Sequence, residues 1–154
     1  TDLIVLDHEG YLAYFERFRA STGELLLKPG RRIFHATNCS LYNSKKGVLD
    51  ASEGVLRLND GIGGQSGRRK ICFTDWDGDG RLDLIVDSQN AAWFRNVREE
   101  NGEVRYEYMG NVNDHVLAGH TTCPTPVDWN NDGRPELLLG AEDGHFYLVP
   151  NNTK

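Results

Sequence analysis

An internal repeat constrains the fold of this chain more than any other feature of its sequence. Residues 75–83 read Asp-Trp-Asp-Gly-Asp-Gly-Arg-Leu-Asp, and residues 128–136 read Asp-Trp-Asn-Asn-Asp-Gly-Arg-Pro-Glu, an offset of 53 positions. The same offset carries the aromatic pair Trp93-Phe94 onto Phe146-Tyr147, well beyond the acidic segment. The two regions are therefore copies of one structural unit, and a repeat of this length points to an array of similar units.

A third copy opens the chain. At an offset of 81, Asp2–Val5 falls on Asp83–Val86, and Leu12 falls on Trp93. Asp2 then corresponds to the last residue of the acidic segment, and the sequence is expected to start in the middle of a repeat.

Each copy reads as a small antiparallel meander. Short apolar runs with β-branched and aromatic residues flank the acidic segment, and turn-forming pairs follow at Gln89-Asn90 and Asn101-Gly102. Four short strands per unit, at a period of about 40–50 residues, are typical of a β-propeller blade. The strands expected in the middle copy are 71–74, 82–87, 91–97 and 103–109.

The expected fold is all-β: a partial β-propeller built from antiparallel four-stranded blades, with about three repeats of which the first and last are incomplete. Strand counts of three, four and three are expected in the successive copies. We expect a single domain over residues 1–154, whose parts are repeat 1 at about 2–34, an irregular insertion at 35–70, repeat 2 at about 71–110 and repeat 3 at about 119–150.

The acidic segment has the spacing of a calcium-binding loop. Ca²⁺ takes six to eight oxygen ligands, and loops supply carboxylates at positions 1, 3 and 5 and a carbonyl at position 7. Here these positions are Asp75, Asp77, Asp79 and Arg81, and Asp83 closes the loop at position 9. An EF-hand needs flanking helices and a glutamate at position 12, where this chain has Val86. The alternative is a solvated acidic turn that binds nothing.

These residues resemble the FG-GAP or VCBS-type repeat of bacterial surface proteins and of integrin α-subunit propellers. The resemblance rests on residues 73–86 and covers about 65–110 and 119–150. It implies two structural Ca²⁺ sites. The first and stronger would be formed by Asp75, Asp77, Asp79, Arg81 and Asp83. The second would be formed by Asp128, Asn130, Asp132, Arg134 and Glu136. It is expected to be weaker, because an asparagine replaces one aspartate.

Incomplete repeats leave unpaired strand edges, which are aggregation hazards unless something covers them. We expect these edges to be covered by the remaining propeller blades or by another chain.

Composition excludes some classes of function. The formal net charge of −6 offers no basic excess for nucleic acid. No apolar run approaches the roughly 18 residues that a membrane-spanning helix needs. Three cysteines, Cys39, Cys72 and Cys123, cannot all pair within one chain. We expect Cys72 and Cys123 to be small buried hydrophobic residues, with a disulfide involving Cys39 as the rival interpretation.

Catalytic candidates are few. His120 precedes an expected inner strand, and with Arg68 or Arg69 and Tyr42 it could supply the base, the cation and the acid of a polysaccharide lyase. The structural alternative is that His120 only forms hydrogen bonds between blades. Trp76 and Trp129 are expected to pack between blades, and Trp93 is expected in the core.

Three functional hypotheses follow, because the resemblance extends to propellers of bacterial carbohydrate-degrading systems. The first is a non-catalytic, calcium-stabilised module that binds or presents glycans, with polysaccharide as its partner. The second is part of a carbohydrate-active enzyme such as a polysaccharide lyase, and the third is an integrin-like adhesion module. Calcium sites of modest affinity favour an exported bacterial protein, whether extracellular, periplasmic or at the cell surface, where calcium is millimolar.

Overall fold

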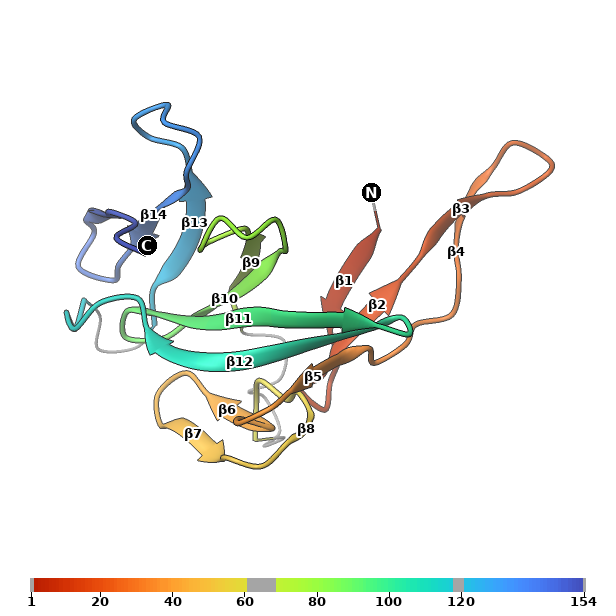
Figure 1. Cartoon of the computed structure of the whole chain (residues 1–154), viewed down its shortest axis with the longest axis horizontal. Helices are drawn as coiled ribbons and strands as arrows, with labels where there is room; N and C mark the ends of the chain where they lie inside the picture. Colours follow the sequence, from red (N-terminus) through yellow and green to blue (C-terminus); the bar gives the residue numbers. More distant parts are fainter. Residues whose placement is uncertain (1, 61–68, 118–120, 154) are drawn as a thin grey trace.

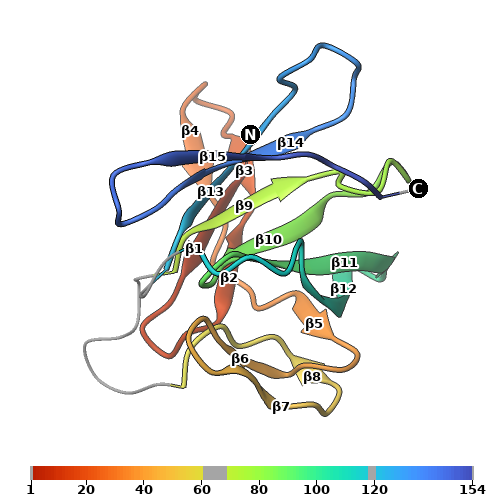
Figure 2. The same ribbon diagram turned by 90° about the vertical axis from the view of Figure 1, so that its left-hand side faces the viewer.

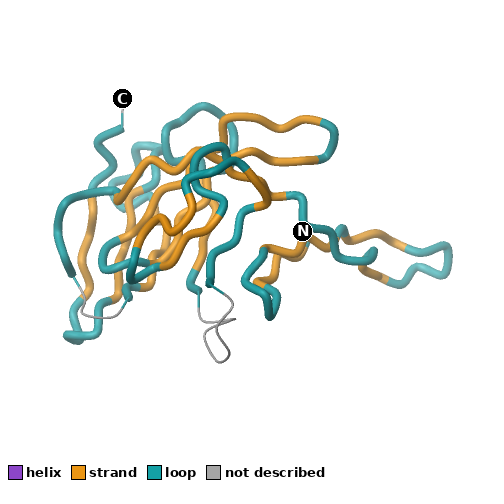
Figure 3. The backbone as a smooth tube through the Cα atoms, turned by 90° about the horizontal axis from the view of Figure 1, so that it is seen from below, coloured by secondary structure: helices purple, strands orange, loops and turns teal. Residues whose placement is uncertain are grey.

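The computed structural model describes residues 2–60, 69–117 and 121–153, and this part of the chain is built from strands and turns without a helix (Figure 3). The all-β prediction is confirmed. The described residues thus contain no helix that could span a membrane. The strands are β1 (Leu3–Leu6), β2 (Leu12–Phe15), β3 (Arg17–Arg19), β4 (Leu25–Leu27), β5 (Phe34–Ala36), β6 (Leu41–Asn43), β7 (Gly47–Asp50), β8 (Gly54–Val55), β9 (Ile71–Thr74), β10 (Asp83–Asp87), β11 (Ala91–Glu100), β12 (Glu103–Asn111), β13 (Cys123–Val127), β14 (Glu136–Gly140) and β15 (Phe146–Val149).

The middle copy forms the antiparallel meander that its sequence predicts. Strands β9, β10, β11 and β12 pair in chain order, and their bounds agree with the four expected segments. The long β11–β12 hairpin turns at Asn101-Gly102, where both residues have positive φ, 54° and 77°. Asparagine and glycine tolerate this left-handed backbone, and such a turn matches the twist of the strands it joins.

The middle sheet contains more than the four predicted strands. β12 pairs in parallel with β5, and β5 pairs with β8, so the sheet has six strands in the order β8-β5-β12-β11-β10-β9. The outer edge of the repeat is therefore covered from within the chain. The sequence does not predict the parallel pairing of β5 with β12, because the two strands are far apart along the chain and no local pattern links them.

The segment expected to be irregular, 35–70, contains four short strands in its described part. Phe34, Ala36, Tyr42, Leu56 and Leu58 are all buried in one hydrophobic core with the middle sheet. The expectation of an irregular insertion is therefore wrong for residues 35–60. Strands of two to four residues are too short to produce a recognisable alternation of apolar and polar positions.

The third copy has the predicted three strands, whereas the first copy has four short strands in place of the predicted three. In the third, β13, β14 and β15 form a three-stranded antiparallel sheet. In the first, β1 pairs with β2 and β3 pairs with β4. Only Glu16 separates β2 from β3, and Tyr14 and Arg31 exchange backbone hydrogen bonds of 2.8 and 2.9 Å beside β4.

The three copies are stacked face to face. Strands β9–β12 lie between β1–β4 on one side and β13–β15 on the other (Figure 1), and β5–β8 lie on the side away from β13–β15 (Figure 2). One hydrophobic core joins the first copy, β5–β8 and one face of the middle sheet. A second core joins the opposite face of the middle sheet to the third copy. The described residues form no closed barrel and no closed ring of blades.

The strand pairing corrects the sequence alignment at the third strand of each unit. Trp93 lies opposite Ile85, Leu148 lies opposite Leu138, and Tyr14 lies opposite Ile4. Trp93 therefore corresponds to Leu148 and not to Phe146. The turn after β10 is residues 88–90, whereas the equivalent turns after β1 and β14 are 7–11 and 141–145, so the middle copy is two residues shorter at this point.

Candidate functional site: two acidic turns

The first acidic turn, residues 75–82, joins β9 to β10. Oxygen atoms of Asp75, Asp77 and Asp79 all lie within 4.8 Å of one another, which is close enough for one cation to be held by all three. Gly78 and Gly80 have φ of 76° and 86°, and a side chain at either position would strain the backbone. The sequence-predicted positions 1, 3 and 5 are therefore brought together.

Backbone hydrogen bonds fix the three carboxylates. Gly80 N–H donates to Asp75 Oδ2 at 3.0 Å, Asp79 N–H donates to Asp77 Oδ1 at 3.2 Å, and Arg81 N–H donates to Asp79 Oδ1 at 3.0 Å. One oxygen of each carboxylate thus shapes the turn. The other oxygen of Asp75, Oδ1, is buried and has no hydrogen-bond partner among the described residues. A buried carboxylate oxygen without a partner is costly, and a cation held by this turn would offset that cost.

Two arginines offset the charge of the other carboxylates. Arg95 Nε lies 2.5 Å from Asp77 Oδ2, and its Nη2 lies 3.5 Å from Asp79 Oδ2. Arg81 also contacts Asp79 Oδ2 through its guanidinium group. Three carboxylates at this spacing repel one another unless positive charge is close by. A metal ion entering the turn would compete with Arg81 and Arg95 for the same oxygens.

Asp83, the predicted ligand at position 9, accepts three hydrogen bonds within the protein. Its buried carboxylate accepts hydrogen bonds from Trp76 N at 3.3 Å, Trp93 Nε1 at 2.9 Å and Asn96 N at 2.7 Å. Burial raises the pKa of Asp83, and these donors oppose that shift. Asp83 is not part of the carboxylate cluster and ties the turn to β11. Spacing alone could not reveal this, because its partners are 10 and 13 residues away on another strand.

The second acidic turn, residues 128–135, has the same backbone structure between β13 and β14. Gly133 N–H donates to Asp128 Oδ2 at 3.1 Å, Asp132 N–H donates to Asn130 Oδ1 at 2.9 Å, and Arg134 N–H donates to Asp132 Oδ1 at 2.8 Å. Asn131, with φ 59°, takes the place of Gly78. The two turns therefore share three hydrogen bonds and both left-handed positions.

The charge of the second turn is balanced differently. The Asn130 amide Nδ2 donates to Asp132 Oδ2 at 3.0 Å and to Glu136 Oε1 at 3.1 Å. Glu136 Oε2 accepts from Trp129 N at 2.8 Å, as Asp83 accepts from Trp76. The Arg134 guanidinium reaches Thr153 O at 2.5 Å and leaves the turn. An amide donor thus lies among these carboxylates, where the first turn has arginines.

Asp2 repeats the position of Asp83 in the first copy. Asp2 Oδ2 accepts from Tyr14 Oη at 2.9 Å, as Asp83 Oδ2 accepts from Trp93. Asp2 Oδ1 accepts from Arg17 N at 2.8 Å, as Asp83 Oδ1 accepts from Asn96 N. The structure therefore confirms the alignment of the first copy with the middle one at the end of the acidic segment.

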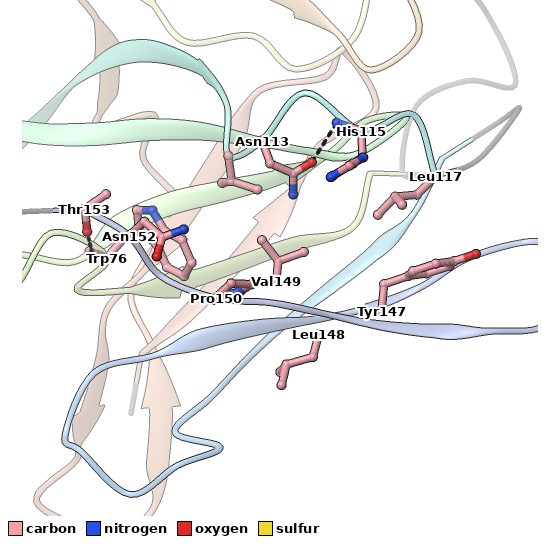
Figure 4. A pocket seen from close by; sticks show the side chains of 11 residues that line it. Trp76, Asn113, His115, Leu117, Tyr147, Leu148, Val149, Pro150, Asn152 and Thr153 are labelled. Atoms are coloured by element: carbon pink, nitrogen blue, oxygen red, sulfur yellow. Dashed lines mark hydrogen bonds between the residues drawn. The ribbon is translucent and has the colours of Figure 1, made fainter.

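A pocket of about 630 Å³ lies between the second and third copies. Figure 4 shows Trp76 at one end and Tyr147 at the other, with Asn113 and His115 on the opposite wall. His115 N–H donates to Asn113 Oδ1 at 2.8 Å. The pocket combines aromatic rings with amide and imidazole groups, which are the groups that bind small polar ligands.

Of the predicted catalytic residues, Tyr42 and Arg69 lie in the described part of the chain, and the side chains of both are largely buried. Tyr42 is 1% exposed and packs edge-on against Phe94, so its hydroxyl cannot contact a polymer. Arg69 is largely buried, and its Nη1 lies 3.8 Å from the buried carboxylate of Asp87. His120 and Arg68 lie outside the described residues.

Two expectations about individual side chains are corrected. Trp76 is 3% exposed in the core between the second and third copies, whereas Trp129, its equivalent, is 61% exposed. Cys123 is exposed rather than buried, and Cys39, Cys72 and Cys123 are all free thiols. Trp93 is partly buried against the second core, as predicted.

These features define a class: an all-β protein made of stacked units in which a strand, an acidic turn and a second strand recur. Comparison with known families agrees, since residues 75–139 match the FG-GAP-like repeat, a region that includes both acidic turns and the strands between them. Searches of curated proteins and of solved structures returned no match.

Proposed function

We propose that this chain is an interaction module of FG-GAP-like repeats whose acidic turns bind Ca²⁺. The stacked copies would be neighbouring blades of a propeller-type array, with the middle copy supplying a full set of four strands. The observation that carries the calcium proposal is the first turn. Three carboxylates converge there, and the buried Oδ1 of Asp75 has no partner.

Calcium would act as a structural ion in this proposal. Oxygen ligands would come from Asp75, Asp77 and Asp79, with the carbonyl of Arg81 as the expected fourth. Because an ion that binds only the folded turn stabilises the folded state, its binding free energy adds to the free energy of unfolding. Arg81 and Arg95 would turn away from the carboxylates when the ion enters, so affinity should be modest.

The second turn is proposed as the weaker site. Asn130 supplies one amide oxygen in place of a carboxylate, and a lower ligand charge lowers calcium affinity. The shared backbone of the two turns supports assigning both to the same ligand class.

Calorimetric titration of the calcium-stripped chain with CaCl₂ tests the proposal, with MgCl₂ as the comparison ion. We expect Asp77→Asn to abolish the stronger binding event and Asp132→Asn to leave it intact. Asp114→Asn, an exposed aspartate outside both turns, is the matched control and should bind as the parent does. Absence of calcium binding by the well-folded parent would refute the metal assignment.

Glycan binding is a second candidate function, and the pocket between the second and third copies favours it. Tyr147 offers a ring on which a sugar can stack, and Asn113, Asn152 and His115 offer polar groups. We propose an exported bacterial protein as its setting, with polysaccharide as the partner. Tryptophan fluorescence can report binding of neutral and acidic oligosaccharides, because Trp76 lines the pocket. His115→Ala should weaken that binding, and an unchanged signal at every oligosaccharide would exclude this candidate.

A polysaccharide lyase is the enzymatic alternative. It is supported only by the residue types His120 and Arg68. Formation of unsaturated product from acidic polysaccharides, lost in His120→Ala, would establish it, and the buried position of Tyr42 requires a different acid.

A further inference from the structure

Each of the three copies has two faces at its second and third strands, because side chains alternate along a strand. We name one of these the forward face. It contains Ile4 and Tyr14 in the first copy, Ile85 and Trp93 in the second, and Leu138 and Leu148 in the third. The opposite face is the rear face; its members, copy by copy, are Leu3, Val5, Ala13 and Phe15; Leu84, Val86, Ala92 and Phe94; and Leu137, Leu139, Tyr147 and Val149.

The forward face of the second copy packs against the rear face of the third. Ile85, Trp93 and Trp76 share the second hydrophobic core with Leu137, Leu139, Tyr147 and Val149. Two polar contacts reinforce this interface: the Trp76 carbonyl accepts hydrogen bonds from Asn151 Nδ2 at 2.7 Å and from Thr153 Oγ1 at 3.0 Å.

The forward face of the first copy packs toward the rear face of the second in the same way. Ile4, Leu6 and Tyr14 pack against the first hydrophobic core, which contains Leu84, Val86, Ala92 and Phe94. One rule therefore describes both internal interfaces: the forward face of each copy meets the rear face of the next.

Two faces, one on each outer copy of the stack (Figure 1), are covered by none of the described residues. On the third copy the forward face exposes Leu148, Phe146 and Trp129, and Phe146 is 76% exposed. Leu12, which aligns with Phe146, is buried in the first core, so this position normally carries a core residue. On the first copy the rear face exposes Leu3 and Val5, although the equivalent residues Leu84 and Val86 are fully buried.

We propose that a second copy of this chain docks head to tail, with the rear face of its first repeat packed on the forward face of the third repeat. Leu3 and Val5 of one molecule would contact Leu138, Leu148 and Trp129 of the other. The interface repeats the contact that Leu137 and Leu139 make with Ile85 and Trp76 within a single chain. Arg17, which aligns with Asn151, is exposed and would lie near the Trp129 carbonyl, as Asn151 lies near that of Trp76.

This contact is heterologous, since each molecule uses two different surfaces. Heterologous contacts build closed rings if the rotation returns to the start, and open chains of molecules if it does not. The proposal does not depend on calcium, on a glycan or on any closed propeller. It needs only the two faces and the rule that the internal interfaces follow.

Analytical ultracentrifugation of the whole chain from about 1 to 100 µM, the range over which micromolar association is resolved, tests the proposal. The parent should associate as the concentration rises. Val5→Glu should disable the rear face and Leu148→Glu the forward face, and either variant alone should be monomeric. An equimolar mixture of the two variants should form dimers and nothing larger, because each keeps one intact and complementary face.

Leu49→Glu is the matched control. Leu49 is as exposed as Val5 and Leu148 but lies on β7, away from both faces, so this variant should associate like the parent. Circular dichroism of each variant establishes that a monomer is folded. A parent chain that stays monomeric throughout overturns the proposal. So does association of Val5→Glu or Leu148→Glu alone, because that requires a different surface.

Discussion

The indole N–H of Trp93 donates to Oδ2 of Asp83 at 2.9 Å, and this bond joins the end of the first acidic turn to the middle of β11. Tyr14 makes the equivalent bond to Asp2 in the first copy, also at 2.9 Å. The two bonds differ in their surroundings, since Asp83 is fully buried and Asp2 is exposed. We therefore expect this hydrogen bond to contribute more to the free energy of unfolding in the middle copy than in the first.

Removing the donor should reveal that difference. Trp93→Phe leaves a buried carboxylate short of one hydrogen bond and should lower the free energy of unfolding by about 2 kcal/mol. Tyr14→Phe should have a much smaller effect, because water can replace the hydroxyl at an exposed aspartate. Urea unfolding of both variants measures the two losses. Equal losses would show that burial of Asp83 does not govern the strength of this contact.

Calcium removal should destabilise the chain if the first turn binds the ion as proposed. We expect the melting temperature to rise with CaCl₂ and to return when EGTA is added, because the ion binds only the folded turn. Asp77→Asn should abolish most of this response. A parent melting temperature that ignores calcium would contradict the proposal.

The buried carboxylate of Asp87 should make stability depend on pH. Burial raises the pKa of Asp87 above its usual 3.8, against the opposing effects of Arg69 and Lys70. The folded chain thus binds this proton more tightly than the unfolded chain does, so protonation favours folding. As the pH falls from 7 through the pKa of Asp87 towards 3.8, the parent should gain stability relative to Asp87→Asn. Urea unfolding at several pH values measures this difference, and parallel profiles would contradict the expectation.

The three thiols should react at different rates. Cys123 is exposed, whereas burial raises the pKa of Cys39 to about 11 and that of Cys72 to about 12. Because the thiolate is the reactive form, a thiol reagent at pH 8 should modify one cysteine rapidly and the other two only on unfolding. Cys123→Ser should remove the rapid phase. Rapid modification of two or more thiols in the folded parent would contradict this assignment.

The left-handed backbone at Asn131 predicts a difference between two substitutions. Asn131→Gly should be nearly neutral, because glycine adopts φ near 59° without strain. Asn131→Ala should lower the free energy of unfolding by about 1 kcal/mol, since Cβ disfavours that conformation. Thermal unfolding of both variants compares them. A loss in the glycine variant as large as that in the alanine variant would show that the left-handed backbone does not govern the preference for asparagine at this position.

The sequence predicted the middle copy well because its signals are local. Asn101-Gly102 marks the hairpin, the acidic turn marks the β9–β10 connection, and apolar runs fill the strands between them. It also predicted which carboxylates converge, since Asp75, Asp77 and Asp79 lie in one turn.

Contacts between distant segments were not predictable in this way. The pairing of β5 with β12, the hydrogen bonds that occupy Asp83 and the exposure of Trp129 all depend on neighbours in space. The third-strand alignment failed for a simpler reason: the turn after β10 is two residues shorter than its equivalents, and an ungapped offset cannot record a deletion.

The parallel pairing of Phe34 with Val104 has a consequence for the order in which the chain is made. Seventy residues separate these partners, so at a synthesis rate of about 5–20 residues per second β5 leaves the ribosome roughly 4–14 seconds before β12 does. During that interval Phe34 and Ala36 belong to a strand without its central neighbour. The antiparallel β5–β8 pairing joins segments much closer in sequence, so it can form during that interval and cover one edge of β5 before β12 exists.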